Sequence, residues 1–217
     1  MSWFSSTVGR KLLMALSAIF LVSYLLIHVL INMLSVFSPE AFNEASHFMG
    51  TNPVVQFLLQ PILMLGIVFH FVMGFVLEAK NRAARPVRYA KKDKSNASWM
   101  SQTMMYSGLV ILAFLGLHFA DFWIPEMNYK YVEVLPEDPT RYYDELVHQF
   151  QSPVRLILYL VAFVLLALHL YHGFQSSLQS MGINNRFTPS IKKFTEAYAI
   201  LIPLGFVIIA VYHYFNH

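Results

Sequence analysis

The stretch LLMALSAIFLVSYLLIHVLINML, residues 12–34, decides the fold of this chain. It exceeds the roughly 18 to 20 apolar residues that are needed to cross the hydrocarbon core of a bilayer. Arg10 and Lys11 precede it, as basic residues would in a signal peptide, but the run is too long for one and no small-residue cleavage pattern follows. We therefore predict a retained first membrane helix over about residues 8–37.

Four further apolar runs of comparable length follow, at about residues 54–79, 100–123, 154–180 and 194–215. The chain of 217 residues is 57% hydrophobic and only 12% charged, whereas about a quarter of the residues of an ordinary soluble domain are charged. Turn and helix-stop residues separate the runs, and no internal repeat divides the sequence. The sequence predicts an all-α membrane protein, one bundle domain of five transmembrane helices over residues 1–217.

The distribution of Lys and Arg predicts the orientation of this bundle, because short basic connections stay in the cytoplasm. One side of the membrane would carry Arg10, Lys11, Lys80, Arg82, Arg85, Arg88, Lys91, Lys92, Lys94, Arg186, Lys192 and Lys193. The other side would carry Lys130, Arg141 and Arg155. We expect a cytoplasmic N-terminus, an external C-terminus and a small external cap formed by residues 125–152. Because the basic residues flank membrane spans, no nucleic-acid partner is expected.

The composition also restricts the cofactors that the chain can bind. It has no cysteine, which excludes disulfides, thiolate metal sites, Cys-bound iron–sulfur clusters and the thioether attachment of c-type haem. Any haem would have to be held by His or Met.

Histidines inside the spans are the main functional signal, because ionisable side chains in a membrane are costly and usually face the bundle interior. A single such histidine would most simply be a neutral imidazole bonded to a neighbouring helix. One on each of four successive helices instead favours a cofactor site. The residues are His28, His70, His118 and His169 with His172, and His213 lies near the external end of the fifth span.

The depths of these histidines, at a rise of about 1.5 Å per residue, divide them into two pairs. His28 and His118 lie about 27 and 26 Å from the cytoplasmic ends of their helices and share the external half of the membrane. His70 lies about 15 Å from that end, and His169 and His172 about 20 and 15 Å. Two depth-matched pairs are what two bis-His haems stacked across the bilayer require. Depth slightly favours His172 over His169 and leaves that choice open.

Glycines near the histidines would give a flat macrocycle room between helices. They are Gly66 and Gly74 on either side of His70, Gly116 before His118, and Gly173 one turn after His169. The alternative is ordinary small-residue packing between membrane helices.

At this point the sequence resembles a known family over nearly the whole chain: the one-polypeptide, two-haem cytochrome b membrane anchor of succinate:quinone oxidoreductases and quinol:fumarate reductases. The motifs that carry the resemblance are specific together and weak singly. They are His28 followed by Asn32, the loop Glu40-Ala41-Phe42-Asn43 to His47-Phe48-Met49, His70 with Gly74, His118, and His169-x-x-x-Gly173 leading to Gly182.

The resemblance implies that His28 and His118 are the axial ligands of an outer haem b. It implies His70 and His169 as the ligands of an inner haem b, with His169 preferred because the family pattern places Gly four residues after the ligand. His172, Arg10, Lys11 and Arg82 are expected as weaker contacts to haem propionates or quinone. Bis-His iron has no open position, and no acid–base catalytic residue is expected in the chain.

The resemblance also implies the surroundings of the chain. It would be a multi-pass subunit of the inner (cytoplasmic) membrane, within a complex II type enzyme of the tricarboxylic acid cycle. It would pass electrons between an iron–sulfur subunit and a quinone, with menaquinone favoured by the two-haem type. A flavoprotein carrying FAD would complete the complex, and the basic tract Lys80 to Lys94 would face the iron–sulfur subunit.

Two alternatives remain. The first is a di-haem cytochrome b of another quinone-linked oxidoreductase, such as a hydrogenase or formate dehydrogenase, although its ligands are distributed differently over the helices. The second is a proton-coupled transporter with a histidine relay. The absence of buried Asp or Glu in the spans, and of paired Gly/Pro-broken helices, argues against it. The sequence does not distinguish succinate oxidation from fumarate reduction, and it leaves the oligomeric state open.

Overall fold

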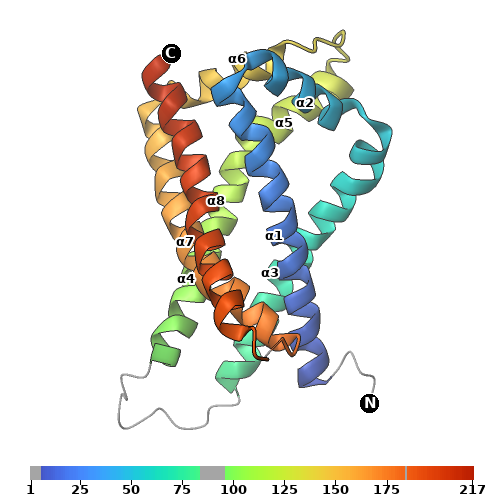
Figure 1. Cartoon of the computed structure of the whole chain (residues 1–217). Helices are drawn as coiled ribbons and strands as arrows, with labels where there is room; N and C mark the ends of the chain where they lie inside the picture. The colour runs from blue at the N-terminus through green and yellow to red at the C-terminus, as the bar shows by residue number, and fades with distance from the viewer. Residues whose placement is uncertain (1–5, 84–95, 184) are drawn as a thin grey trace.

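The computed structural model describes residues 6–83, 96–183 and 185–217, without the side chains of residues 96–102. Within these ranges the chain is helical, with short connections and no β-strand. Five helical segments are long and apolar enough to cross a membrane, and α1 begins at the end of the molecule opposite to the one where α8 ends (Figure 1). The five are Thr7–Phe37 (α1), Val55–Ala83 (η2 and α3), Thr103–Val132 (α4 to η4), Pro153–Ser180 (α7) and Thr188–Asn216 (α8). The predicted all-α bundle is confirmed, and its orientation in the membrane stays a prediction.

Local sequence signals set the ends of these helices. The Ser6 hydroxyl accepts a hydrogen bond from the backbone N–H of Gly9 at the start of α1 (3.0 Å). Ser38 ends α1 and also caps the next helix, because its hydroxyl accepts from the N–H of Ala41 (3.1 Å). Gly182 follows α7 with φ +79°, a left-handed conformation that favours glycine and stops the helix.

The connection after the first span is a helix, α2 (Pro39–Thr51), where the sequence suggested a loop. It lies across the end of the bundle beside α6 (Arg141–Phe150), α5 (Ile124–Met127) and the π-helical turn η4 (Asn128–Val132) (Figure 1). Asn43 on α2 accepts from the backbone N–H of Tyr143 on α6 (2.8 Å), and Lys130 donates to the carbonyl of Gly50 (2.5 Å). These elements form the expected cap, with α2 as an additional part of it.

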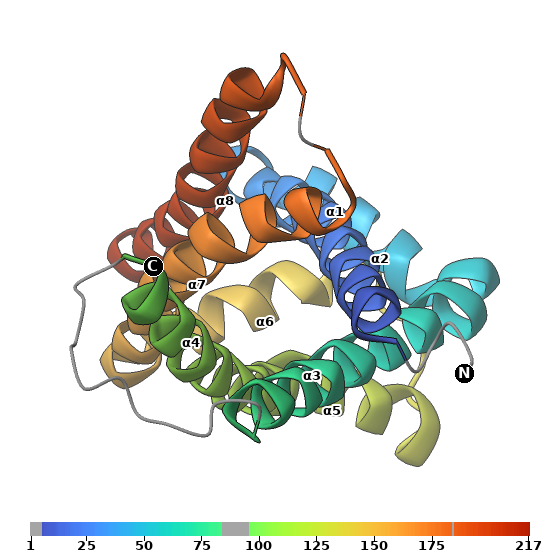
Figure 2. The same cartoon turned by 90° about the horizontal axis from the view of Figure 1, so that it is seen from below.

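Four of the spanning helices form a ring. α1 packs on α3 (Gln60–Ala83) and on α7, while α4 (Asn96–His118) packs on α7 and less extensively on α3. The diagonal pairs, α1 with α4 and α3 with α7, make almost no backbone contact in the described part of the chain. Viewed along the bundle, α8 lies outside this ring (Figure 2), where it packs on α7 and α1. Any side chain that reaches the centre of the ring therefore faces the helix on the opposite corner.

The apolar core is displaced towards α8. The side chains of Ala199 and Ala210 on α8 are fully buried, and Phe163 on α7 and Val29 on α1 are buried beside them. By contrast, no residue of α3 is buried in this chain. α3 is therefore the spanning helix that the chain's own core holds least.

The glycines near the histidines differ in how closely other helices approach them. A Cβ on Gly66 would lie 2.7 Å from the Phe20 ring, so this glycine permits close packing of α3 on α1. A Cβ on Gly116 would meet nothing within 4 Å, but residues two apart on a helix face in opposite directions, so Gly116 does not make room beside His118. A Cβ on Gly173 would come within 3.3 Å of the Met104 methyl group. At Gly66 packing is thus the better explanation.

We expect Gly205→Ala to destabilise the bundle. A Cβ on buried Gly205 would lie 2.8 Å from Cγ2 of Val29, where α8 meets α1. Overpacking of this kind costs about 1–3 kcal/mol, which outweighs the roughly 1 kcal/mol that Ala gains over Gly in a helix. Gly116→Ala is the matched control and should leave the thermal midpoint in detergent unchanged or slightly higher. Equal midpoints for the two variants would contradict this assignment.

Candidate functional site

The ring brings the spanning histidines together as two pairs, one on each diagonal. The ring centroids of His28 on α1 and His118 on α4 lie 5.7 Å apart, with an interplanar angle of 81°. The centroids of His70 on α3 and His169 on α7 lie 6.4 Å apart, at 71°. Depth along the helices predicts the first pair and, for the second, His70 with either His169 or His172. Of the two fourth-span histidines that depth left open, His169 is the one whose ring stands against His70.

Both pairs have the spacing that one metal ion between two imidazoles requires. Metal–imidazole bonds are about 2.0 to 2.1 Å long, so imidazoles on opposite sides of one iron have centroids roughly 6 Å apart. In the described part of the chain, Nε2 of none of the four rings forms a hydrogen bond. The donor set is two neutral nitrogens without thiolate or carboxylate, which suits haem iron. The residues therefore fit a bis-His haem at each pair.

In the His70 and His169 pair, each Nδ1 atom lies within hydrogen-bond distance of a serine hydroxyl. Nδ1 of His70 lies 3.1 Å from the Ser17 hydroxyl, and Nδ1 of His169 lies 3.2 Å from the Ser107 hydroxyl. Each serine donates its own hydrogen to a backbone carbonyl three residues earlier, at 2.8 Å and 3.1 Å. Since a hydroxyl has one hydrogen, each serine must accept from the imidazole N–H. That tautomer leaves Nε2 with its lone pair free.

The His28 and His118 pair has a different environment. The Asn32 amide nitrogen donates to the carbonyl of His28 (2.8 Å) and stands 3.4 Å from Nδ1 of the same ring, at the limit of a hydrogen bond. Nδ1 of His118 is buried without a partner among the described residues. Aromatic rings surround this pair instead: Tyr24, Phe114, Phe122, Tyr159 and Phe206.

His213 belongs to neither pair. It is fully buried on α8, and its Nε2 lies 2.8 Å from the Ser35 hydroxyl, which donates to the carbonyl of Asn32 (2.6 Å). The serine therefore accepts from Nε2–H, the nitrogen that remains free in the two pairs. This bond fastens α8 to α1, so we assign His213 a structural role.

The weaker candidates lie towards the end of the bundle where α1 begins. Arg10 and Lys11 are in the first turns of α1, and His172 lies one turn beyond His169 on α7. Arg82 is exposed at the end of α3 and forms an ion pair with Glu78 on its own helix (2.6 Å). Arg82 is thus committed to a local pair. Of the basic tract, Arg85, Arg88, Lys91, Lys92 and Lys94 lie outside the described residues.

The expectation that no span contains a buried acid is wrong. Asp121 lies in the π-helical turn Phe119–Trp123 (η3) of the third span and is only 4% exposed. One carboxylate oxygen pairs with Arg155 (2.6 Å), and the other accepts from the Tyr159 hydroxyl (2.9 Å). Both partners lie on α7, so this cluster joins the two helices one turn beyond His118. Sequence patterns missed it because the partners are more than thirty residues away.

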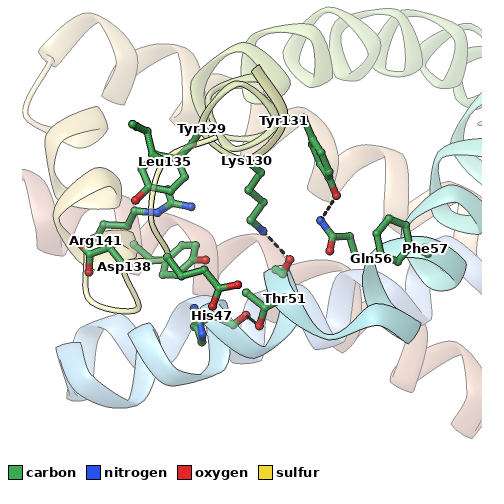
Figure 3. Close-up of a pocket in the computed structure, with 13 residues that line it drawn as sticks. His47, Thr51, Gln56, Phe57, Tyr129, Lys130, Tyr131, Leu135, Asp138 and Arg141 are labelled. Carbon is green, nitrogen blue, oxygen red and sulfur yellow. Dashed lines mark hydrogen bonds between the residues drawn. The ribbon is translucent and has the colours of Figure 1, made fainter. Parts of the chain in front are cut away.

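A cavity of about 280 Å³ opens within the cap. Lys130 and Tyr131 reach into it from η4 towards Thr51 and Gln56, with Arg141 at its other side (Figure 3). Its walls are polar and aromatic and include His47, Thr51, Phe57, Lys130, Arg141 and Tyr142. Burial, and then the nearby Glu126 carboxylate, raise the pKa of Tyr142 to about 12. Its phenol is therefore a hydrogen-bond donor at neutral pH.

Comparison with curated proteins finds a relative of this chain. The chain is 25% identical over 181 residues to the succinate dehydrogenase cytochrome b558 subunit of Bacillus subtilis (strain 168), covering 82% of this chain and 81% of the relative. The resemblance to cytochrome b subunits of succinate dehydrogenases is confirmed. No family model matches the sequence. No solved structure matches it either.

This similarity and the five apolar helices bear out the predicted localisation. The cytochrome b-like chain is a multi-pass membrane protein, and the relationship to a bacterial subunit supports the cytoplasmic membrane. The pairing of His28 with His118 and of His70 with His169 is a property of this chain's geometry, independent of that similarity.

We expect Asp121→Asn to destabilise the contact between η3 and α7. The substitution keeps the shape of the side chain but removes the charge that pairs with Arg155. Because the Arg155 side chain is 36% exposed, water compensates part of the loss, and we expect a cost of about 1–3 kcal/mol rather than that of a fully buried pair.

The measurement is thermal unfolding in detergent of Asp121→Asn, Arg155→Gln and the double variant. The double variant should lose less than the two single losses added together, since they remove one interaction. Asp144→Asn, an exposed acid on α6, is the control. Fully additive losses would show that Asp121 and Arg155 do not act as a pair.

Proposed function

We propose that this chain is the membrane anchor and electron-transfer subunit of a succinate dehydrogenase or fumarate reductase. It carries electrons between an iron–sulfur subunit and a membrane quinone, with menaquinone favoured, through two b haems. The observation that carries this proposal is the presence of two histidine pairs on the two diagonals of one helical ring, each with the spacing of a bis-His iron site. Similarity to a succinate dehydrogenase cytochrome b558 subunit supports the same assignment.

The two proposed haem sites lie at two levels of the membrane, and each would be held by its own histidine pair. When bound, each haem supplies an iron that takes up and releases one electron at a time. His28 and His118 would hold the outer iron, and His70 and His169 the inner one. An iron held by two imidazoles would have no position open to oxygen or substrate. The aromatic rings around the outer pair surround it with apolar surface.

The partners would bind at the cytoplasmic end, where α1 begins and α3 ends. Basic residues gather there in the sequence, from Lys80 to Lys94. An iron–sulfur subunit with an acidic docking face would be attracted to this end, and a flavoprotein with FAD would bind behind it. The charge asymmetry of the two ends supports this placement, with Arg10 and Lys11 adding to the same side.

The quinone head group would bind in the cap cavity. A quinone needs donors for its carbonyl oxygens and apolar surface for its ring, and the cavity offers the Tyr142 phenol, His47 and Phe57. Nδ1 of His47 is buried without a partner among the described residues. The cavity is built on the same helical segment that continues from His118 through η3 and α5. It therefore lies towards the outer histidine pair.

The haem assignment predicts a visible spectrum. The purified complex should contain two b haems per chain, measured as pyridine haemochrome and as a reduced-minus-oxidised difference spectrum. Alanine at His28, His70, His118 or His169 should lower this number towards one or none, because each removes an axial ligand. His172→Ala and His213→Gln are the controls and should keep both haems.

The same experiment separates the alternatives. A colourless preparation would overturn electron transfer and favour the proton-coupled transporter, whose case gains from the buried Asp121. Two haems without associated succinate dehydrogenase activity would favour a cytochrome b of another quinone-linked oxidoreductase.

The cavity assignment predicts a quinone-specific defect. Tyr142→Phe removes one donor and should lower the rate of quinone reduction by succinate about tenfold, the effect of roughly 1.4 kcal/mol in the barrier, while both haems remain. Tyr143→Phe is the matched control, because the neighbouring Tyr143 hydroxyl contacts Nε2 of His217 (3.0 Å) and does not line the cavity. Succinate oxidation with a soluble dye should be normal in both variants. Unchanged quinone reduction in Tyr142→Phe would place the quinone elsewhere.

A further inference from the structure

The two serines beside the inner histidine pair occur in a repeated arrangement. Ser17 on α1 precedes His28 by eleven residues, and Ser107 on α4 precedes His118 by eleven residues. Eleven residues are about three helical turns, so each serine lies on the same helix face as the histidine of its own helix and about 16 Å away along the axis. Two opposite helices of the ring thus present a histidine at the outer level and a serine at the inner level.

The serines contact the histidines of the other two helices. Ser17 on α1 meets Nδ1 of His70 on α3, and Ser107 on α4 meets Nδ1 of His169 on α7, at 3.1 and 3.2 Å. Both serines are buried, at 9% and 4% exposed. All four helices of the ring therefore contribute to the inner level, two with an imidazole and two with a hydroxyl.

We propose that Ser17 and Ser107 are positioning residues of the inner haem, which hold its two axial imidazoles in the iron-binding tautomer and lower its reduction potential relative to a site without them. This inference rests on the proposed haem function. An acceptor at Nδ1–H fixes the ring and makes its other nitrogen a stronger donor to the metal. A stronger donor stabilises the oxidised iron. Among the described residues, Nδ1 of His28 faces only the Asn32 amide nitrogen at 3.4 Å, and Nδ1 of His118 has no partner. We therefore expect the effect at one haem.

A merely structural role is the alternative, because a serine–histidine bond between membrane helices also holds them together. The chain contains such a bond between Ser35 and His213. It involves Nε2, the nitrogen that stays free in the two histidine pairs, so His213 is not placed to bind iron in the same way. It also contains Ser177, which is buried on α7 and donates to the carbonyl of Phe174 (2.7 Å), with no histidine partner among the described residues. These two serines are the matched controls.

The test is a redox titration of the two haems, followed by their visible and electron paramagnetic resonance spectra, in the complete complex purified from membranes. Ser17→Ala and Ser107→Ala should each raise the midpoint potential of the inner haem, change its resonance spectrum and leave the outer haem unchanged. The inner haem is identified as the one lost in His70→Ala. Ser17→Thr, which restores a hydroxyl, should return the potential towards the original value. Ser177→Ala and Ser35→Ala should shift neither haem.

The possible results distinguish failure of this inference from failure of the proposed haem function. Loss of the inner haem alone in a serine variant, with recovery by threonine, also supports a positioning role. Two haems with unchanged potentials and spectra in both Ser17→Ala and Ser107→Ala would overturn the inference, as would an equal shift in Ser177→Ala. Absence of haem from the unsubstituted complex would instead overturn the proposed function itself.

Discussion

The structure depends on giving partners to imidazole nitrogens inside the membrane, where no water is available to bind them. A polar group that is buried in hydrocarbon without a partner costs several kilocalories per mole, and each imidazole has two nitrogens to satisfy. The four-helix bundle of α1, α3, α4 and α7 directs one imidazole from each helix to its centre, opposite the imidazole of the diagonal helix. At the inner level, Nδ1 of each ring is satisfied by a serine. Nε2 then remains as the nitrogen available to a bound group.

Much of this arrangement could be predicted from the sequence, because it depends on one-dimensional quantities. Length and hydropathy determine the five spans. Depth along alternating helices pairs His28 with His118 without any knowledge of packing, since the rise per residue is fixed. The ambiguity between His169 and His172 had a physical origin: residues at i and i+3 share a face, and depth differs between them by less than one turn.

The remaining features depend on contacts between distant segments, which sequence patterns do not contain. The burial of Asp121 has no local sequence signal, because its partners, Arg155 and Tyr159, lie on another helix. For Gly66 the sequence leaves cofactor space and helix packing as alternatives, and only the position of Phe20 shows that it serves packing. The helix α2 had a local signal, since Ser38, Pro39 and Glu40 provide an N-cap, a first-turn proline and a first-turn acid.

The two histidine pairs differ in their surroundings, and this difference would affect the reduction potentials at the two levels of the bundle. The inner pair donates two hydrogen bonds to serines, whereas the outer pair stands among aromatic rings, one turn from a buried carboxylate. A carboxylate at that distance disfavours an added electron, while its pairing with Arg155 offsets part of the field. At the inner level the serines would also disfavour an added electron, because their hydrogen bonds make the histidine ligands stronger donors. The balance between through-space charge at one level and ligand hydrogen bonding at the other would therefore set the relative potentials of two chemically identical haems.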